Sequence, residues 1–275
     1  MSGSSSLSDQ LGKIVIVGGG KMGEAILAGM LSSGAVDVGS VVVANPGEEK
    51  RTRLSKVYGV RCVPDASEVE HPDTCILAVK PQVIRDVLSG LSDTPTFDPK
   101  RIISIAAGIS TSTISEYFPN SHVVRGMPNT PLMVGKGTVG LSVGSDTPPE
   151  EGQLAKQLFE CMGSAVVVDE SLQDAVVAVS GSGPAYFALF VQALAKAGED
   201  LGLPGNLSLE LAQQTMIGTG ALLEKTGQSP EQLIEAVSSP GGTTVAALEK
   251  MKSENVEKAI ADGAFAAAKR SKELS

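Results

Sequence analysis

A glycine-rich turn directly after an apolar run constrains this chain more than any other feature. Ile14-Val15-Ile16-Val17 leads straight into Gly18-Gly19-Gly20-Lys21-Met22-Gly23. In a Gly-x-Gly-x-x-Gly turn, the first glycine permits the tight turn, the second lets backbone approach a pyrophosphate, and the third lets the following helix pack on its strand. The turn follows a strand-like run and precedes a helix-like one, so it predicts a dinucleotide-binding turn at the edge of a parallel sheet.

The pattern from Lys13 to about Glu170 supports that fold class. Short β-branched runs alternate with longer mixed segments, as in strands that are buried on both faces beneath covering helices. We expect strands at 14–17, 41–44, 60–62, 75–79, 102–105, 122–126, 138–143 and 165–168. We expect helices at 22–31, 48–58, 83–91 and 153–162. The sequence therefore predicts an α/β, Rossmann-like doubly wound domain over residues 11–170, preceded by a disordered tail over residues 1–10 that lacks the features of a signal peptide.

The character of the chain changes after Glu170, where β-branched runs give way to alanine, leucine and glycine. Residues 171–275 are expected to form an all-α domain. Its helices are rich in small residues, as in 259–268, and several carry apolar side chains on more than one face. Such helices normally have neighbours on every side, so the pattern predicts dimerisation through this domain. The alternative is a monomeric bundle with alanines selected for helix propensity alone.

One stretch requires a check as a membrane span, because no charge falls between Asp174 and Lys196. That length suffices for a helix to cross about 30 Å of hydrocarbon. Ser180-Gly181-Ser182-Gly183-Pro184 stands in its middle and would break the helix. We expect two buried segments joined at a turn and no membrane partner.

Composition narrows the function classes. The chain has 22 basic and 31 acidic side chains, a formal net charge of −9, which disfavours a nucleic-acid partner. Cys62, Cys75 and Cys161 are widely spaced beside apolar residues, which predicts reduced core thiols and a cytoplasmic protein. His71 and His122 lack companions at metal-ligand spacing, so no metal site is expected.

The end of the second strand bears on cofactor choice. An NAD-specific site usually places Asp or Glu there, on the adenosine ribose. This chain has Asn45, followed by Lys50, Arg51 and Arg53. The missing negative charge favours NADPH, with NADH as the alternative. The alternative role for the three basic residues is a solvated helix face.

A second anion site is predicted near the C-terminus. Ser238-Ser239-Pro240-Gly241-Gly242-Thr243-Thr244 leads into the helix-like run Val245-Ala246-Ala247-Leu248-Glu249. Backbone N–H groups at a helix N-terminus bind carboxylate or phosphate without a cationic side chain. The alternative is an ordinary helix cap preceded by a turn. The sequence therefore predicts one site for a nucleotide and another for a small acid.

Other chemistries fit less well. Gly140-Leu141-Ser142-Val143-Gly144 matches a nucleophile elbow, but Ser145-Asp146-Thr147-Pro148-Pro149 follows where a helix should start, and no histidine lies downstream. A hydroxyacid-dehydrogenase-like enzyme would need a general base, commonly lysine, and residues 171–195 contain no lysine. A non-catalytic NADP-binding redox sensor remains open; it would not require the second anion site.

With both loops in view, the chain resembles pyrroline-5-carboxylate reductases from about Lys13 to its C-terminus. Seven motifs carry the resemblance: Gly18-Gly19-Gly20-Lys21-Met22, Ala78-Val79-Lys80-Pro81-Gln82, Ala106-Ala107-Gly108, Arg125-Gly126-Met127-Pro128-Asn129-Thr130-Pro131, Ser180-Gly181-Ser182-Gly183-Pro184-Ala185-Tyr186, Gly202-Leu203-Pro204 and Val237-Ser238-Ser239-Pro240-Gly241-Gly242-Thr243-Thr244. The resemblance implies hydride transfer from NADPH or NADH to a cyclic imine carboxylate, giving L-proline in the last step of proline biosynthesis. It also implies a dimer with interlocking helices, and assembly of dimers into decamers.

The resemblance further implies site residues. Cofactor contacts are expected at Gly18, Gly19, Gly20, Lys21, Met22, Asn45, Pro46, Ala78, Val79, Lys80, Pro81, Ala106, Ala107, Met127, Asn129, Thr130 and Pro131. Contacts to the substrate carboxylate are expected at Ser239, Pro240, Gly241, Gly242, Thr243 and Thr244. The Thr243 N–H and the Thr244 hydroxyl are the principal donors, and Thr244 is the favoured candidate for a catalytic group. Two positions depart from the family pattern: Val177 replaces threonine, and Ala236 replaces asparagine or aspartate.

Overall fold

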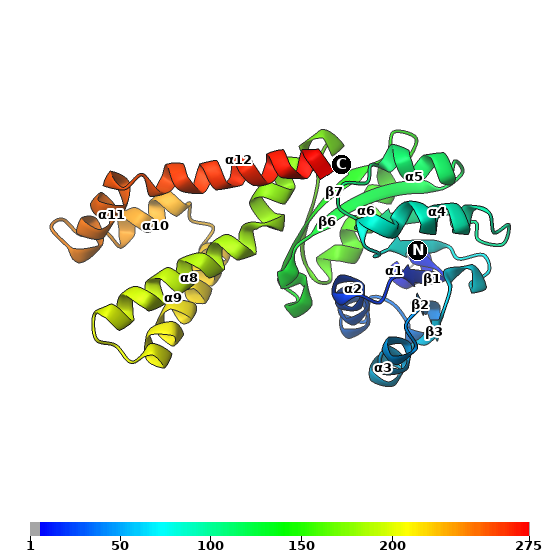
Figure 1. The fold of residues 1–275 in the computed structure, drawn as a ribbon, viewed down its shortest axis with the longest axis horizontal. Coiled ribbons are helices and arrows are strands. Elements are labelled where there is room, and N and C mark those ends of the chain that lie inside the picture. The colour runs from blue at the N-terminus through cyan, green and yellow to red at the C-terminus, as the bar shows by residue number, and fades with distance from the viewer. Residues whose placement is uncertain (1–5, 275) are drawn as a thin grey trace, which may run out of the picture. The chain divides into compact units, whose positions relative to one another are not determined.

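The computed structural model describes residues 6–274 of the 275-residue chain. These residues form two compact units. One runs to Gly181 and also includes the last turns of the C-terminal helix from Ala267, whereas the other comprises Ser182–Ala266. Figure 1 shows the elements of both along the chain.

A single sheet of eight strands organises the first unit. Its strands lie in the order β3-β2-β1-β4-β5-β6-β7-β8. Their bounds are Ile14–Val17 for β1, Val41–Ala44 for β2, Arg61–Val63 for β3, Thr74–Leu77 for β4, Arg101–Ser104 for β5, His122–Pro128 for β6, Gly137–Val143 for β7 and Gly163–Val167 for β8. β2 and β3 follow on one side of β1, and the chain then crosses to the other side of β1, where it adds β4 to β8 in order. The carboxyl ends of β1 and β4 therefore form the switch point at which open α/β sheets bind ligands.

One strand pair departs from the predicted parallel sheet. β6 and β7 are antiparallel, whereas every other neighbouring pair is parallel. Only the short 3₁₀ segment η4 (Thr130–Val134) lies between β6 and β7. A parallel pair needs a crossover of a dozen or more residues, so this short connection dictates an antiparallel pair.

Helices cover both faces of the sheet. They are α2 (Lys21–Ser32), α3 (Glu48–Tyr58), α4 (Ile84–Ser92), α5 (Thr111–Tyr117) and α6 (Pro149–Glu160). Ile14 and Ile16 pack with α2, α3 and α6 in one core cluster, while Val15 and Val17 pack with α4 and α5 in the other. Alternate side chains point to opposite faces, so strands buried on both sides are apolar throughout, as predicted. The predicted strands and helices are all present, with ends shifted by a few residues.

The predicted tail over residues 1–10 is wrong for its described part. Residues 1–5 lie outside the described residues, but α1 spans Leu7–Leu11. Ser6 Oγ accepts a hydrogen bond from the Asp9 N–H at 3.1 Å, and Asp9 accepts one from the Ser6 N–H at 3.1 Å. This capping box satisfies the helix start, and fully buried Leu11 anchors its end.

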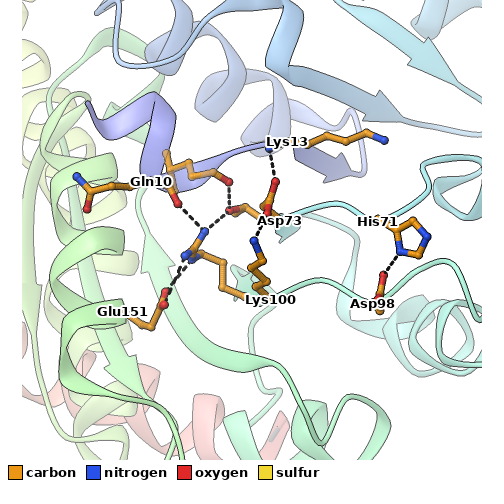
Figure 2. A network of polar contacts seen from close by, with 10 residues as sticks. Gln10, Lys13, His71, Asp73, Asp98, Lys100 and Glu151 are labelled. Carbon is orange, nitrogen blue, oxygen red and sulfur yellow. Dashed lines mark hydrogen bonds and ion pairs between the residues drawn. The ribbon is translucent and has the colours of Figure 1, made fainter. Parts of the chain in front are cut away.

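A polar network holds α1 onto the amino ends of β4 and β5 (Figure 2). The Thr74 hydroxyl donates to the Leu11 carbonyl at 2.6 Å, and Arg101 donates to the Gln10 carbonyl at 2.9 Å. Arg101 also pairs with Glu151 at 2.7 Å, and both side chains are mostly buried. The Lys100 ammonium, with help from the Lys13 N–H, holds the pKa of the nearby Asp73 below its ordinary value. The network lies at the edge of the sheet opposite the switch point.

The first unit ends later than the predicted boundary between residues 170 and 171. Gln173 begins α7 (Gln173–Val176) and is 1% exposed. Its Nε2 donates to the Gly140 carbonyl at 3.2 Å and to Ser142 Oγ at 2.7 Å, both on β7. Val176 fills the space above Gly140, where a Cβ would come within 2.6 Å of it. These contacts join α7 to the sheet.

The described part of the second unit is entirely helical. Its elements are α8 (Gly183–Asp200), α9 (Gly205–Thr226), α10 (Pro230–Ala236), α11 (Thr243–Ser253) and the start of α12 (Val256–Leu274). α8 and α9 pack as a hairpin, and the Ser208 hydroxyl of α9 donates to the Ala195 carbonyl of α8 at 2.7 Å (Figure 1). The buried apolar cluster between them comprises only Val191, Ala195 and Ala212.

The predicted helix break and turn around residues 180–184 are wrong, because one helical run continues from Glu170 to Asp200. Within it, a single π-helical turn over Val177–Gly181, the π-turn, precedes α8, which begins at Gly183. The expectation that the flanking apolar side chains are buried is wrong within a single chain, because Phe187 is 63% exposed. By length and composition alone, the helical run Glu170–Asp200 also qualifies as a membrane span. Helices that pack against protein pass the same test, so this is weak support for a membrane role.

Candidate functional site

The carboxyl ends of β1 and β4 carry the first candidate site. Val17 and Leu77 are register partners at these ends. Gly18 has φ +109°, a conformation that favours glycine, and a Cβ there would come within 2.6 Å of the Ala78 carbonyl oxygen. The glycine turn and the segment after β4, both predicted cofactor contacts, therefore begin side by side.

The other two glycines of the motif differ in what surrounds them. A Cβ on Gly23 would lie 2.0 Å from the Gly18 carbonyl oxygen, so this position lets α2 pack tightly on the turn. A Cβ on Gly20 would meet no protein atom within 4 Å. Gly20 is the N-cap of α2 and has no side chain over the helix start. The open space beside a helix N-terminus suits a pyrophosphate.

A cavity of about 710 Å³ opens at this edge of the sheet. Seven of the predicted cofactor contacts line it: Gly18, Gly20, Asn45, Pro46, Ala78, Val79 and Lys80. The remaining predicted contacts do not line it: Gly19, Lys21, Met22, Pro81, Ala106, Ala107, Met127, Asn129, Thr130 and Pro131. The cavity thus brings together the ends of β1, β2 and β4.

Sequence reasoning missed part of the cavity wall. Residues 64–67 after β3 contribute to it, as do Val83, Asp86, Val87, Gly90 and Leu91 in and before α4. These residues could have been predicted from their position after the strands. β3 and β4 end at the same edge as β1, so the residues that follow them line the same crevice.

Of the three basic residues after Asn45, only Lys50 lines this cavity. Arg51 donates to the carbonyls of Asn45 at 2.9 Å and Pro46 at 2.6 Å, which fixes the turn after β2. Arg53 pairs with Glu24 of α2 at 2.8 Å and holds the pKa of that carboxyl below its ordinary value. Two of the three side chains therefore serve the fold, while Lys50 is placed to contact a ligand.

Asn45 connects the end of β2 with the glycine turn. Its Oδ1 accepts a hydrogen bond from the Gly19 N–H at 3.2 Å. Its own N–H donates to the Val63 carbonyl at 3.0 Å. The side chain that stands in place of the usual acid is therefore held at the cavity rim.

The segments after β5 and β6 lie at the same carboxyl edge. Ala106 is buried in the core, whereas Ala107 is exposed. η4, which follows Asn129, packs against α2, so the Met127–Pro131 segment lies beside the helix that begins at the glycine turn. Asn129 itself is only 8% exposed and is hydrogen-bonded within the unit.

The second candidate site lies in the helical unit and is built by a tight turn. The Gly242 N–H donates to the Ser239 carbonyl at 2.9 Å, and Gly241 between them has φ +71°. Pro240 followed by a glycine at positive φ is typical of a type II turn. A Cβ on Gly242 would lie 2.9 Å from the Ser239 carbonyl oxygen, so a side chain there would force the backbone of the turn to shift. The turn delivers the chain into α11, whose first residue is Thr243.

This helix start has unused donors. Gly242 is the N-cap and provides no side-chain cap. Among residues 6–274, neither the Thr243 N–H nor the Thr244 hydroxyl has a hydrogen-bond partner. The Ser238 hydroxyl oxygen, just before the turn, is buried without one. Unsatisfied donors at the positive end of a helix dipole suit a small carboxylate.

Neither histidine lies at these sites. His71 precedes β4 and contacts Asp98 through Nδ1 at 2.7 Å, and His122 begins β6. Both stand at the amino edge of the sheet. Within the described part of the chain, no cluster of three or more His, Cys, Asp or Glu side chains is arranged to hold a metal. The three cysteines are free thiols, with Cys75 buried and the other two half-buried.

Fold and site together define a nicotinamide-dependent oxidoreductase with a separate helical unit. Residues 13–108 match the family described as NADP oxidoreductase, coenzyme F420-dependent. Residues 170–274 match the family described as pyrroline-5-carboxylate reductase dimerisation.

Individual relatives agree with these matches. The pyrroline-5-carboxylate reductase of Synechocystis sp. is 40% identical over 98% of this chain and 99% of that protein. A pyrroline-5-carboxylate reductase structure from Coxiella burnetii superposes with a TM-score of 0.90 at 34% identity, over 96% of this chain and 99% of that one. One from Plasmodium falciparum, with NADP bound, gives 0.83 at 26% identity over 96% and 98%. The chain belongs to the pyrroline-5-carboxylate reductase family.

Proposed function

We propose that this protein reduces the cyclic imine of 1-pyrroline-5-carboxylate to L-proline with hydride from NADPH, or from NADH as the alternative, in the last step of proline biosynthesis. Its family membership over the whole length supports the reaction. The observation that carries the proposal is the open helix start at Thr243, because a protein that only senses nucleotide has no need of it.

The chain's own residues would contribute binding and orientation. The cavity at the switch point, with Gly18, Gly20 and Ala78, holds the nucleotide, whose role is to supply hydride. The Thr243 N–H and the Thr244 hydroxyl hold the substrate carboxylate. A cyclic imine is basic enough to be partly protonated in water, so a site without histidine suffices. Rate acceleration then comes from positioning and fixed dipoles.

One assay tests this function. Oxidation of NADPH and of NADH is followed separately with pyrroline-5-carboxylate, and NADP⁺ reduction is followed with a hydroxy acid as the control. We expect turnover with the imine and none with the hydroxy acid. Tight NADPH binding without imine turnover would support a redox sensor, and turnover of the hydroxy acid would support a hydroxyacid-dehydrogenase-like enzyme.

We predict that Asn45→Asp shifts cofactor preference towards NADH. An aspartate keeps the acceptor for the Gly19 N–H and adds a negative charge where the 2′-phosphate of NADPH would lie. The ratio of kcat/KM for NADPH to that for NADH should fall roughly tenfold or more. Lys50→Ala should lower the same ratio by removing attraction, whereas Arg53→Ala, whose side chain pairs with Glu24, should change both cofactors equally. An unchanged ratio in Asn45→Asp would remove the ribose assignment.

We also propose that the protein is a soluble homodimer of a reducing, cytoplasmic compartment, in which dimers assemble further into decamers. The second unit supports self-association because most of its large apolar side chains are exposed, among them Phe187 at 63% and Phe265 at 72%. Apolar surface on this scale marks an interaction site. A sedimentation experiment at several protein concentrations would give the stoichiometry. A stable monomer would contradict the proposal.

A further inference from the structure

Asn129 directly follows β6, and its side chain joins two backbone groups from elsewhere in the first unit. Its Oδ1 accepts a hydrogen bond from the Thr138 N–H on β7 at 2.9 Å. Its Nδ2 donates to the Ser180 carbonyl in the π-turn at 3.1 Å. The amide therefore acts as a bridge between β7 and the π-turn, and both bonds are partly buried.

The Ser180 carbonyl needs this donor for a reason that the sequence explains. In a regular helix it would accept from the N–H four residues later, which belongs to Pro184, and proline has no N–H. The next N–H, of Ala185, donates to the Ser182 carbonyl instead at 3.0 Å. Ser180 is half-buried, and a main-chain carbonyl shielded from water without a donor is costly. Asn129 supplies the hydrogen bond that the π-turn and Pro184 leave unmade.

The bridge also fixes the strand that leads to it. A Cβ on Gly181 would lie 3.3 Å from Met127 Cε, so the Met127 side chain packs directly on the π-turn. Met127 is paired with Gly140 of β7 in the sheet register. The segment from Met127 to Asn129 is thus held on one side by β7 and on the other by the π-turn.

We propose that Asn129 is a positioning residue that acts through this bridge, rather than a cofactor contact as predicted from the resemblance. The inference rests on the proposed reductase function. Asn129 holds the Met127–Pro131 segment between β7 and the π-turn and beside α2, the helix that begins at the glycine turn, where this segment would border the nicotinamide of a bound cofactor. Its loss should therefore lower kcat and leave NADPH affinity largely intact.

Asn129→Asp and Asn129→Ala separate the two hydrogen bonds. The aspartate keeps the acceptor for Thr138 but turns a carboxylate towards the Ser180 carbonyl oxygen, which repels it; when protonated, the same carboxyl donates. Facing a carbonyl, it should titrate above the ordinary value for aspartic acid. Alanine loses both bonds and cannot titrate.

Few other groups near position 129 can titrate. η4, β7 and the π-turn contain no ionisable side chain. β6 contributes His122 at its far end and Arg125, which pairs with Glu170 at 3.2 Å, and Lys136 precedes β7. These ionisable groups are present in both variants. The ratio of kcat of Asn129→Asp to kcat of Asn129→Ala at each pH therefore reports the titration of the carboxyl that Asn129→Asp introduces.

We expect both variants to lose at least about tenfold in kcat near pH 8, while the Kd for NADPH from fluorescence titration stays within about threefold of wild type. The kcat of Asn129→Asp relative to Asn129→Ala should rise towards about pH 6. In cofactor-free protein, the Thr138 amide should exchange hydrogen faster in Asn129→Ala and not in Asn129→Asp.

Two results would overturn this role for Asn129. One is a large rise in the Kd for NADPH with kcat unchanged, which indicates direct cofactor contact. The other is a kcat ratio that does not change with pH. Failure of the proposed function is a separate result, since wild-type protein would then show no imine turnover, while the NADPH titration and the Thr138 exchange would still report on the bridge.

Discussion

Gly20→Val should abolish NADPH binding and leave the protein folded. A Cβ at this position meets no protein atom within 4 Å, so the fold has room for a side chain. That room is the space at the start of α2 where we place the pyrophosphate. A branched side chain there would block the close approach of backbone to phosphate on which the site depends. The Kd for NADPH should rise at least about 100-fold, as measured by fluorescence titration.

The neighbouring glycines provide the contrast that makes this test specific. A Cβ on Gly23 would lie 2.0 Å from the Gly18 carbonyl oxygen, so Gly23→Ala should destabilise the fold itself. Gly39 has as much free space as Gly20 but lies away from the cavity, and Gly39→Val should leave NADPH binding unchanged. For Gly20→Val we expect a change in Tm of only a few degrees, from a poorer helix cap. Normal NADPH affinity in this variant would disprove the placement of the pyrophosphate.

The strands of the sheet could be predicted from the sequence because strands buried on both faces have a simple sequence pattern. Runs such as Val41–Ala44 are apolar at every position and are bounded by turns, so β2 emerges at its predicted residues. α1 and α5 lack such a signal. α5 is short and rich in Ser and Thr. α1 depends on the capping residues Ser6 and Asp9 and on a hydrogen bond that the Thr74 hydroxyl donates to the Leu11 carbonyl, 63 residues away in the sequence. Contacts of that separation cannot be read from local pattern.

The candidate site could be predicted only in part, because many of its contacts also join residues far apart in the sequence. The turn at Gly18 and the position of Asn45 follow from strand ends, and both line the cavity. Sequence could not separate the roles of Lys50, Arg51 and Arg53, because these roles depend on Glu24 and on the carbonyls of the turn after β2. Nor could it show that the amide of Asn129 is engaged with Thr138 and Ser180. Residue identity predicts chemistry, while the partner of a side chain depends on tertiary structure.

Thr243→Pro should strongly weaken substrate binding without disturbing α11. Thr243 is the first residue of that helix, the position where proline is best tolerated because its missing N–H has no helical acceptor. Gly242 has φ −78° and ψ 167°, an extended conformation that a residue before proline readily adopts. The substitution therefore removes one main-chain donor and little else. A hydrogen bond to a carboxylate contributes about 2 kcal/mol, which corresponds to a rise of roughly 30-fold in KM for the imine.

Three further measurements distinguish the loss of one main-chain donor from a general disruption of the loop before α11. Thr243→Ala keeps the N–H and should leave KM almost unchanged, whereas Thr244→Ala removes the proposed hydroxyl donor and should raise KM to a similar extent as Thr243→Pro. NADPH affinity should be normal in all three variants, because α11 and the nucleotide cavity belong to different compact units. If Thr243→Pro binds the imine as well as Thr243→Ala does, the main-chain N–H at the start of α11 is not the carboxylate donor, and the anion must be held elsewhere.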